Sequence, residues 1–207
     1  MASAVGPFVP DGENEPQSVA LAIEKLLAYV LYASATAVME TRSISETAFT
    51  MLIREVVFYE APAQEGESGK ETQEVEMART QRIEMMGYEI GYRFMERMSM
   101  DQKFLGFTEL DLIKFICKDF WDEIFKKKID KLQTNHKGVF VLFDNSFRWL
   151  EKHASDDQKT RDAATTLLHF PCGILRGALA NLGMPVIVNA DFSRLPAITF
   201  NIKAHKG

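Results

Sequence analysis

Hydrophobic residues recur at helical spacing in two segments of the first half of the chain. Residues 45–60 carry them at Phe49, Leu52, Ile53 and Val56, and Ser45 has the side chain of a helix N-cap. Residues 74–98 carry them at Ile83, Met86, Ile90, Phe94 and Met98. The pattern predicts two amphipathic helices, separated by a polar segment that contains Pro and Gly.

A third predicted helix, residues 109–130, is apolar on nearly every side. Leu112, Phe115, Phe120 and Trp121 point in different directions around it, which is typical of a helix at the centre of a fold. Gly87 and Gly91 lie four residues apart in the preceding helix. A glycine inside a helix costs about 1 kcal/mol relative to alanine, so this pair predicts that another backbone packs closely there.

The last third of the chain contains short segments of β character around one more helix. Residues 138–150 read as two strands about an Asp144–Asn145 turn, and residues 184–191 and 196–204 read as two further strands. A helix is predicted over residues 162–182, with Pro171 either kinking it or starting its main portion and Gly183 closing it. This order predicts an α+β fold, with four main helices packed on a four-stranded antiparallel sheet.

The N-terminal 44 residues differ from the rest. Residues 1–16 are rich in Pro, Gly and Glu and are expected to be disordered, whereas residues 17–44 predict an extra apolar helix. Leu26 to Met39 contains no charged residue, but these 14 residues fall short of the roughly 20 that a membrane span needs. A helix buried in the fold or covered by a partner is favoured over contact with a membrane.

The distribution of charge argues against nucleic-acid binding. Residues 1–80 contain 5 Lys or Arg and 13 Asp or Glu, a net charge of −8, while residues 81–207 contain 19 and 16, a net charge of +3. A nucleic-acid-binding domain normally carries a strongly basic face. Cys117 and Cys172 lie in apolar segments, and no basic residue precedes the first apolar stretch, so we expect a protein without a secretory signal in the reducing cytosol.

Motifs for catalysis, metals and cofactors are weak. The glycines form no phosphate-binding loop, and the four histidines show no metal-ligand spacing. His169 and Cys172 lie three residues apart and could meet on one helical face, but a cysteine in an apolar helix is usually structural. Arg176 interrupts the same apolar helix, either as a solvated charge or as a tie to a neighbouring loop, and we favour the tie. We therefore expect neither a catalytic residue nor a cofactor.

A cluster of lysines follows the third predicted helix at Lys126, Lys127, Lys128 and Lys131. Its simplest interpretation is a solvated helix end that complements the helix dipole. The functional alternative is attraction to anionic lipids, worth around 1 kcal/mol per charge.

Four segments together resemble a known family. They are RIEMMGYEIGYRFMERM, KFICKDFWDEIFKKKIDKLQTNHKGVFVLFDNSFRWL, FPCGILRGALANLG and LPAITFNIK, in this order. The chain from residue 45 to residue 204 resembles the transport protein particle (TRAPP) small-subunit family, and specifically its subunit 6 branch. Residues 1–44 have no counterpart in that resemblance.

The resemblance implies an architectural role in membrane traffic. Members of the family are non-catalytic subunits of a cytoplasmic tethering complex, peripheral at Golgi and endoplasmic reticulum membranes, that activates a Rab-type GTPase as an assembly. It also implies that the first two helices of the domain pair with a subunit 3-like protein. The partner-binding residues expected on this basis are Phe49, Leu52, Ile53, Val56, Ile83, Met86, Gly87, Ile90, Gly91 and Phe94.

One departure and one alternative accompany this interpretation. In the subunit 3 branch a cysteine after the second helix accepts a fatty acyl chain, but residues 99–107 contain no cysteine here, so that modification is not expected. The alternative is a small-ligand sensor, because related α+β domains can enclose an apolar pocket and this chain is rich in Phe and Met.

Overall fold

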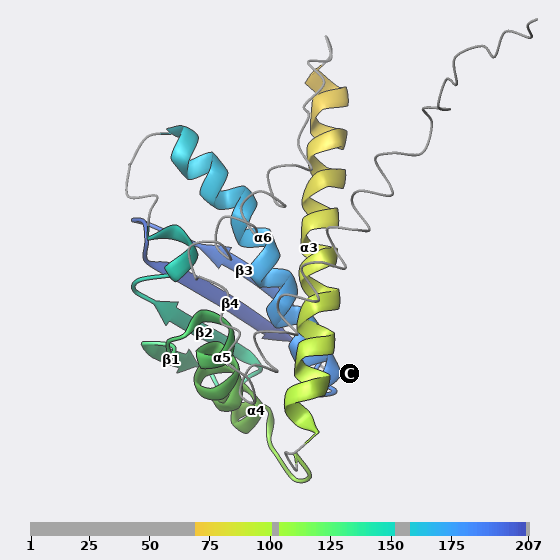
Figure 1. Cartoon of the computed structure of the whole chain (residues 1–207), viewed down its shortest axis with the longest axis vertical. Helices are drawn as coiled ribbons and strands as arrows, with labels where there is room; N and C mark the ends of the chain where they lie inside the picture. Colours follow the sequence, from red (N-terminus) through yellow and green to blue (C-terminus); the bar gives the residue numbers. More distant parts are fainter. Residues whose placement is uncertain (1–68, 101–103, 152–157, 206–207) are drawn as a thin grey trace, which may run out of the picture.

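Helices packed on a four-stranded antiparallel sheet make up the part of the chain that the computed structural model describes, which is residues 69–100, 104–151 and 158–205 (Figure 1). The helices are α3 (Gly69–Ser99), α4 (Glu109–Phe115), α5 (Trp121–Phe125) and α6 (Gln158–Asn181), and the strands are β1 (Lys131–Thr134), β2 (Val139–Asp144), β3 (Val186–Asp191) and β4 (Ile198–Ala204). The predicted α+β class is confirmed. The disordered segment, the extra helix and the helix over residues 45–60 lie outside the described residues.

The sheet has the strand order β1-β2-β4-β3, and every neighbouring pair is antiparallel. Alternate residues of the two central strands are buried, and Phe140 and Leu142 of β2 lie opposite Ile202 and Phe200 of β4. This alternation is the one expected for a sheet with one face covered by helices. The strands predicted over residues 184–191 and 196–204 are confirmed as β3 and β4.

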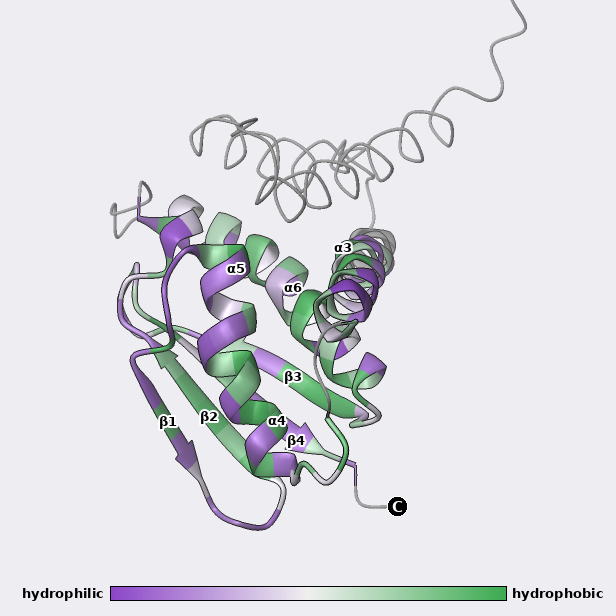
Figure 2. Ribbon diagram, turned by 60° about the horizontal axis from the view of Figure 1, so that its bottom comes forward, coloured by the Kyte–Doolittle hydropathy of each residue, from purple (hydrophilic) through white to green (hydrophobic). Residues whose placement is uncertain are grey.

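The helices form a second and a third layer over the buried face of the sheet. Figure 2 shows α4, α5 and α6 lying over the strands, with α3 beside α6. Helix α3 packs mainly on α6, and α6 in turn packs on β3. Helix α6 therefore lies between the sheet and α3.

The third predicted helix is shorter than expected and is not uniformly α-helical. It begins at Thr108, whose side chain accepts a hydrogen bond from the Asp111 N–H while the Asp111 carboxylate accepts one from the Thr108 N–H. A π-helical stretch, Ile116–Phe120, separates α4 from α5. The helix ends at Lys126, whose φ of 55° is left-handed, so the lysines that follow turn away from the helix axis.

The hairpin predicted around Asp144–Asn145 is wrong. Strand β2 pairs instead with β1, which precedes it, and the chain after Asp144 forms a short 3-10 turn, Arg148–Leu150. The Asp144 carboxylate accepts a hydrogen bond from the Ser146 N–H, which favours a turn over a second strand. Phe147 and Trp149 are then buried in an aromatic cluster rather than exposed alternately along a strand.

None of the helices in the described ranges is long and apolar enough to cross a membrane.

Candidate functional site

Helices α3 and α6 come into backbone contact where they cross. A Cβ atom added to Gly87 would collide with the carbonyl oxygen of Phe170, and one added to Gly91 would collide with the backbone of Ile174. The glycines of α6 are equally constrained, because a Cβ on Gly173 or Gly177 would meet the backbone of α3. The close backbone packing predicted for Gly87 and Gly91 is therefore present, and it lies within the chain.

An ion pair lies beside this crossing and joins the two helices. The guanidinium of Arg176 on α6 lies 2.6 Å from the carboxylate of Glu84 on α3 and over the ring of Tyr88, 5.3 Å from its centroid. Arg176 thus forms a tie, as expected, but its partners belong to a neighbouring helix rather than to a loop. Both ionised side chains are half-buried, which makes the contact stronger than a pair in open solvent.

The structure sorts the expected partner-binding residues of α3. Ile83, Ile90 and Phe94 are buried in the hydrophobic core of the chain, and Gly87 and Gly91 are covered by α6. Met86 is half-buried against the same core. These side chains have little or no surface left for another protein, so a partner contact on α3 has to involve other residues. Four members of the expected set lie outside the described residues, namely Phe49, Leu52, Ile53 and Val56.

The opposite face of α3 carries exposed apolar side chains. Met77, Met85 and Tyr92 are 65%, 53% and 40% exposed, and their spacings of eight and seven residues place them on one side of the helix. We call these three residues the outer face of α3. Large apolar residues grouped on one exposed helix face are typical of a protein–protein contact.

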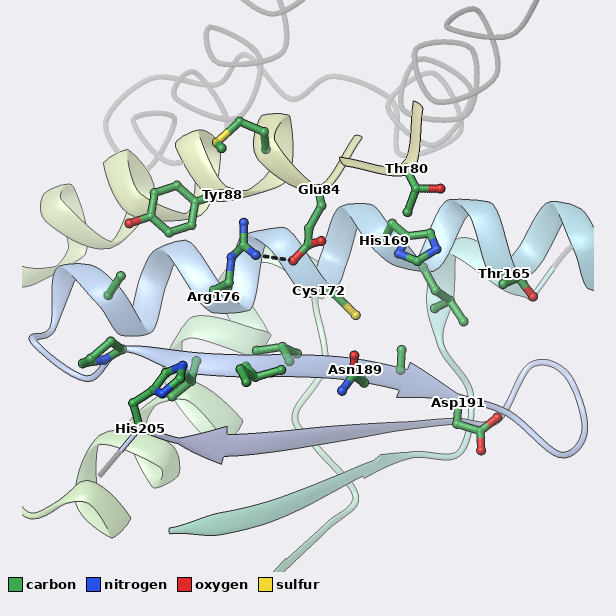
Figure 3. Close-up of a pocket in the computed structure, with 18 of the residues that line it drawn as sticks. Thr80, Glu84, Tyr88, Thr165, His169, Cys172, Arg176, Asn189, Asp191 and His205 are labelled. Atoms are coloured by element: carbon green, nitrogen blue, oxygen red, sulfur yellow. Dashed lines mark ion pairs between the residues drawn. The ribbon is translucent and has the colours of Figure 1, made fainter. Parts of the chain in front are cut away.

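A groove with a volume of about 730 Å³ runs between α3, α6 and the edge strand β3 (Figure 3). Glu84, Tyr88 and Met85, which belongs to the outer face, line it from α3. Arg176, Cys172 and His169 line it from α6. Its opposite wall is β3 itself, from Val186 to Asp191, with Pro185 and His205 at the end nearest Arg176. Apolar side chains such as Leu168 and Val188 line it together with the charged Glu84 and Asp191.

The His169–Cys172 pair in this groove lacks the properties of a nucleophile and its base. Burial raises the pKa of the Cys172 thiol to about 12, and burial also lowers the pKa of His169 against the opposing influence of Glu84 and Glu76. Both groups are therefore neutral at pH 7. The Cys172 thiol instead contacts the backbone of Ala190 in β3, which supports the structural interpretation of this cysteine.

The lysine cluster divides into one interior and three exposed residues. Lys127 turns inward, where its ammonium lies 2.6 Å from the carboxylate of Asp144 and 3.2 Å from that of Asp130. Burial opposes protonation of this lysine, but the two carboxylates outweigh it and raise its pKa. Lys127 is therefore not available to a membrane surface, unlike the exposed Lys126, Lys128 and Lys131.

The carboxylate of Asp144 was missed by the sequence analysis, although it is fully buried. It accepts hydrogen bonds from the Trp121 indole N–H at 3.0 Å and from Lys127, and so fastens α5 to the end of β2. The available signal was an acidic residue directly following the apolar run VFVLF. Glu84 and Tyr88 were missed too, because only the helix crossing shows that they face Arg176.

Comparison with known proteins identifies the family. The family described as "Transport protein particle (TRAPP) component" matches residues 37–205. Trafficking protein particle complex subunit 6b of Danio rerio is 41% identical over 162 residues, which cover 78% of this chain and 98% of that protein. Human subunit 6B is 44% identical over 125 residues, covering 60% of this chain and 78% of the human protein. Bovine subunit 6A is 42% identical over 125 residues, covering 60% and 77%.

A solved structure shares the fold. It is the trafficking protein particle complex subunit 3 from Naegleria fowleri, covalently bound to palmitic acid, and it matches with a TM-score of 0.55 and 14% identity over 78% of this chain and 98% of that one. At this identity the likeness shows the fold alone. The matches in sequence carry the assignment: this chain belongs to the transport protein particle (TRAPP) family and, within its small subunits, to the subunit 6 branch.

Proposed function

We propose that this chain is a non-catalytic, architectural subunit of a TRAPP-type vesicle-tethering complex and that it pairs with a subunit 3-like protein through the outer face of α3. The observation that carries the proposal is the division of α3 into two faces. One face is occupied by α6, whereas the other presents Met77, Met85 and Tyr92 to solvent. A helix with a second apolar face that is exposed in the single chain is expected in a subunit whose partner covers that face.

The relatives support the same proposal. They are named as subunits of a trafficking complex, and a subunit 3 protein has the same fold. Two chains of one fold can pack helix against helix in a pseudo-symmetric pair, as many homo-oligomers do with true symmetry. Activation of a Rab-type GTPase would then be a property of the assembly, with this chain contributing scaffold rather than chemistry.

Peripheral contact with Golgi and endoplasmic reticulum membranes belongs to the same proposal. Lys126, Lys128 and Lys131 are exposed close together in the sequence, and attraction to anionic lipids contributes about 1 kcal/mol per charge. Three charges give weak docking. Stable recruitment would therefore depend on the rest of the complex.

The proposal is tested by introducing charge on the outer face of α3. The double variant Met77→Glu with Tyr92→Glu should keep its fold, because both side chains are exposed and neither lines the groove, and it should no longer co-purify with a co-expressed subunit 3-like protein. Leu105→Glu is the matched control, since Leu105 is 98% exposed and lies beyond the end of α3. Circular dichroism melting checks the fold of each variant. Retention of the pair by the folded double variant would refute pairing through this face.

A further inference from the structure

The free edge of strand β3 can be located from the hydrogen bonds on its other side. The His205 N–H donates to the Pro185 carbonyl at 3.1 Å, and the register places Val186 opposite Ala204. In an antiparallel pair, residues whose backbone groups point to the partner strand alternate with residues whose groups point away. Ile187, Asn189 and Asp191 therefore bond to β4, and the backbone groups of Val186, Val188 and Ala190 point away from it.

That free edge faces the groove. Val186, Val188 and Ala190 all line it, and the backbone of Ala190 is already in contact with the Cys172 thiol on α6. No other described segment supplies a backbone partner for Val186 or Val188 on this side. Val186 and Val188 thus present two pairs of N–H and C=O groups to the groove, in the spacing of a strand.

The two edges of the sheet are protected to different degrees. The opposite edge strand, β1, has four residues and exposes Lys131 and Gln133, which discourages pairing with another chain. Strand β3 has six residues, contains neither Lys nor Arg, and carries Ile187 at 45% exposure. The residues of β3 that discourage pairing with another strand lie only at its ends: Pro185 precedes it and Asp191 is its last residue. The central part of β3 is suited to accept a further strand.

We propose that β3 and the groove bind an extended segment of another subunit of the same assembly, which adds to the sheet as a fifth strand. The backbone of the segment bonds to Val186 and Val188, and alternate apolar side chains enter the groove toward Leu168 and Cys172. Asp191 lies at one end of the groove, whereas the charge of Arg176 farther along it is neutralised by Glu84. The inference rests on the proposed function, because it takes the occupant from the complex.

The size of the groove favours a peptide segment over a second copy of the chain as its occupant. About 730 Å³ lies in the range of roughly 300–1,000 Å³ that holds one ligand or a short peptide segment. It leaves no room for the helices of a second copy between α6 and its own sheet edge. Paired backbone donors and acceptors also match a peptide better than a lipid, whose acyl chain would leave them without hydrogen bonds.

Residue-resolved amide hydrogen exchange tests the inference. The full chain is measured alone, in its pair with the subunit 3-like protein, and in the complex reconstituted from all recombinant subunits. In the chain and in the pair, Val186 and Val188 should exchange faster than Ile187 and Asn189, whose N–H groups are bonded to β4. In the full complex, the exchange of Val186 and Val188 should slow by about tenfold or more.

Each other outcome overturns the inference. Rapid exchange at Val186 and Val188 in the full complex would mean that no strand is added. Slow exchange in the chain alone would mean that its own residues cover the edge, and slow exchange that depends on chain concentration would indicate a second copy. If the chain and the subunit 3-like protein form no pair in the first place, the proposed function fails instead. The two failures are therefore distinguishable.

Variants give a second readout. Val188→Pro removes an N–H that points away from β4, so one further subunit should be lost from the complex, while loss of the buried Val188 side chain also lowers the stability of the chain. Ala180→Trp fills the groove from α6 without changing β3, and it keeps the test decisive if the proline variant is unstable. Ile187→Ala is the control, because it alters an exposed side chain and leaves the free edge intact. Full assembly by both blocking variants would refute the added strand.

Discussion

The two faces of α3 show how one helix can serve both a fold and a complex. The inner face meets α6 through Gly87 and Gly91 at backbone contact, and its large side chains, such as Ile90, are buried. The outer face carries side chains of similar hydrophobicity, Met85 and Tyr92, with no cover from the described part of the chain. Hydrophobicity alone does not distinguish the faces. The glycines do, because only they allow a second helix to approach.

The largest expected effect comes from adding a single methyl group to the inner face. Gly→Ala inside a helix ordinarily stabilises it by about 1 kcal/mol. Gly91→Ala should instead destabilise the chain by about 3 kcal/mol, because the new Cβ collides with the backbone of Ile174 and forces the helices apart. Met85→Ala on the outer face should change the free energy of unfolding by less than about 0.5 kcal/mol. Urea denaturation of both variants measures the difference, and a stabilised Gly91→Ala would show that the helices do not touch there.

Two adjacent lysines at the end of α5 show the same contrast between a buried and an exposed environment. Lys127→Met should cost about 2 kcal/mol, because it leaves the buried carboxylate of Asp144 without its ammonium partner. Lys126→Met should have little effect, since the Lys126 contact with Glu123 at 3.8 Å is exposed.

A second substitution checks the cause of this effect. Asp144→Asn removes the charge but keeps an oxygen for the Trp121 N–H. Added to Lys127→Met, it should recover part of the lost free energy of unfolding. A double variant as unstable as the sum of the two single variants would argue against the ion pair.

An intermediate effect is expected at the border between the two faces of α3, where Arg176 meets Glu84. Both side chains are partly exposed, at 32% and 23%, so solvent screens their attraction. A double-mutant cycle with Arg176→Met and Glu84→Gln should give a coupling free energy of about 1 kcal/mol. The coupling should shrink at high salt. A cycle with no coupling at low salt would mean that the pair positions neither helix.

Periodicity predicted most of the helices and strands but not the surfaces. The helices over residues 74–98 and 162–182 and the strands after Gly183 follow directly from spacing, because burial on one face imposes a period on each element. The hairpin predicted at Asp144 was wrong because the buried Asp144 carboxylate stabilises a turn, and hydrophobic periodicity gives no sign of such a turn. Gly87 and Gly91 were correctly taken as a packing strip. Their contact was expected in a partner, because spacing within one helix does not identify which helix packs on it.

Predicting the groove would have required knowledge of contacts between residues that are still farther apart in the sequence. Glu84, Arg176 and Val188 come from three elements that are distant in the sequence, and only the order of the strands makes β3 an edge. Lys127 and Lys126 are neighbours with opposite environments, because the left-handed residue that ends α5 redirects the chain between them. Such features arise from the ends of elements, where sequence patterns carry least information.

The smallest expected effect is a pH dependence at the α6 wall of the groove, where the fold keeps a histidine neutral. Burial holds the pKa of His169 below its ordinary value of 6.5, with Glu84 and Glu76 only partly offsetting this. The unfolded chain therefore binds more protons than the folded chain below pH 6.5, and stability falls as the pH is lowered through that window. It stops falling once the pH is below the folded-state pKa of His169. His169→Gln should flatten this part of the profile of unfolding free energy between pH 7.5 and 5.5, as measured by urea denaturation at each pH. If the profiles of the wild type and His169→Gln coincide, this histidine titrates equally in both states and the wall of the groove is wetter than its burial implies.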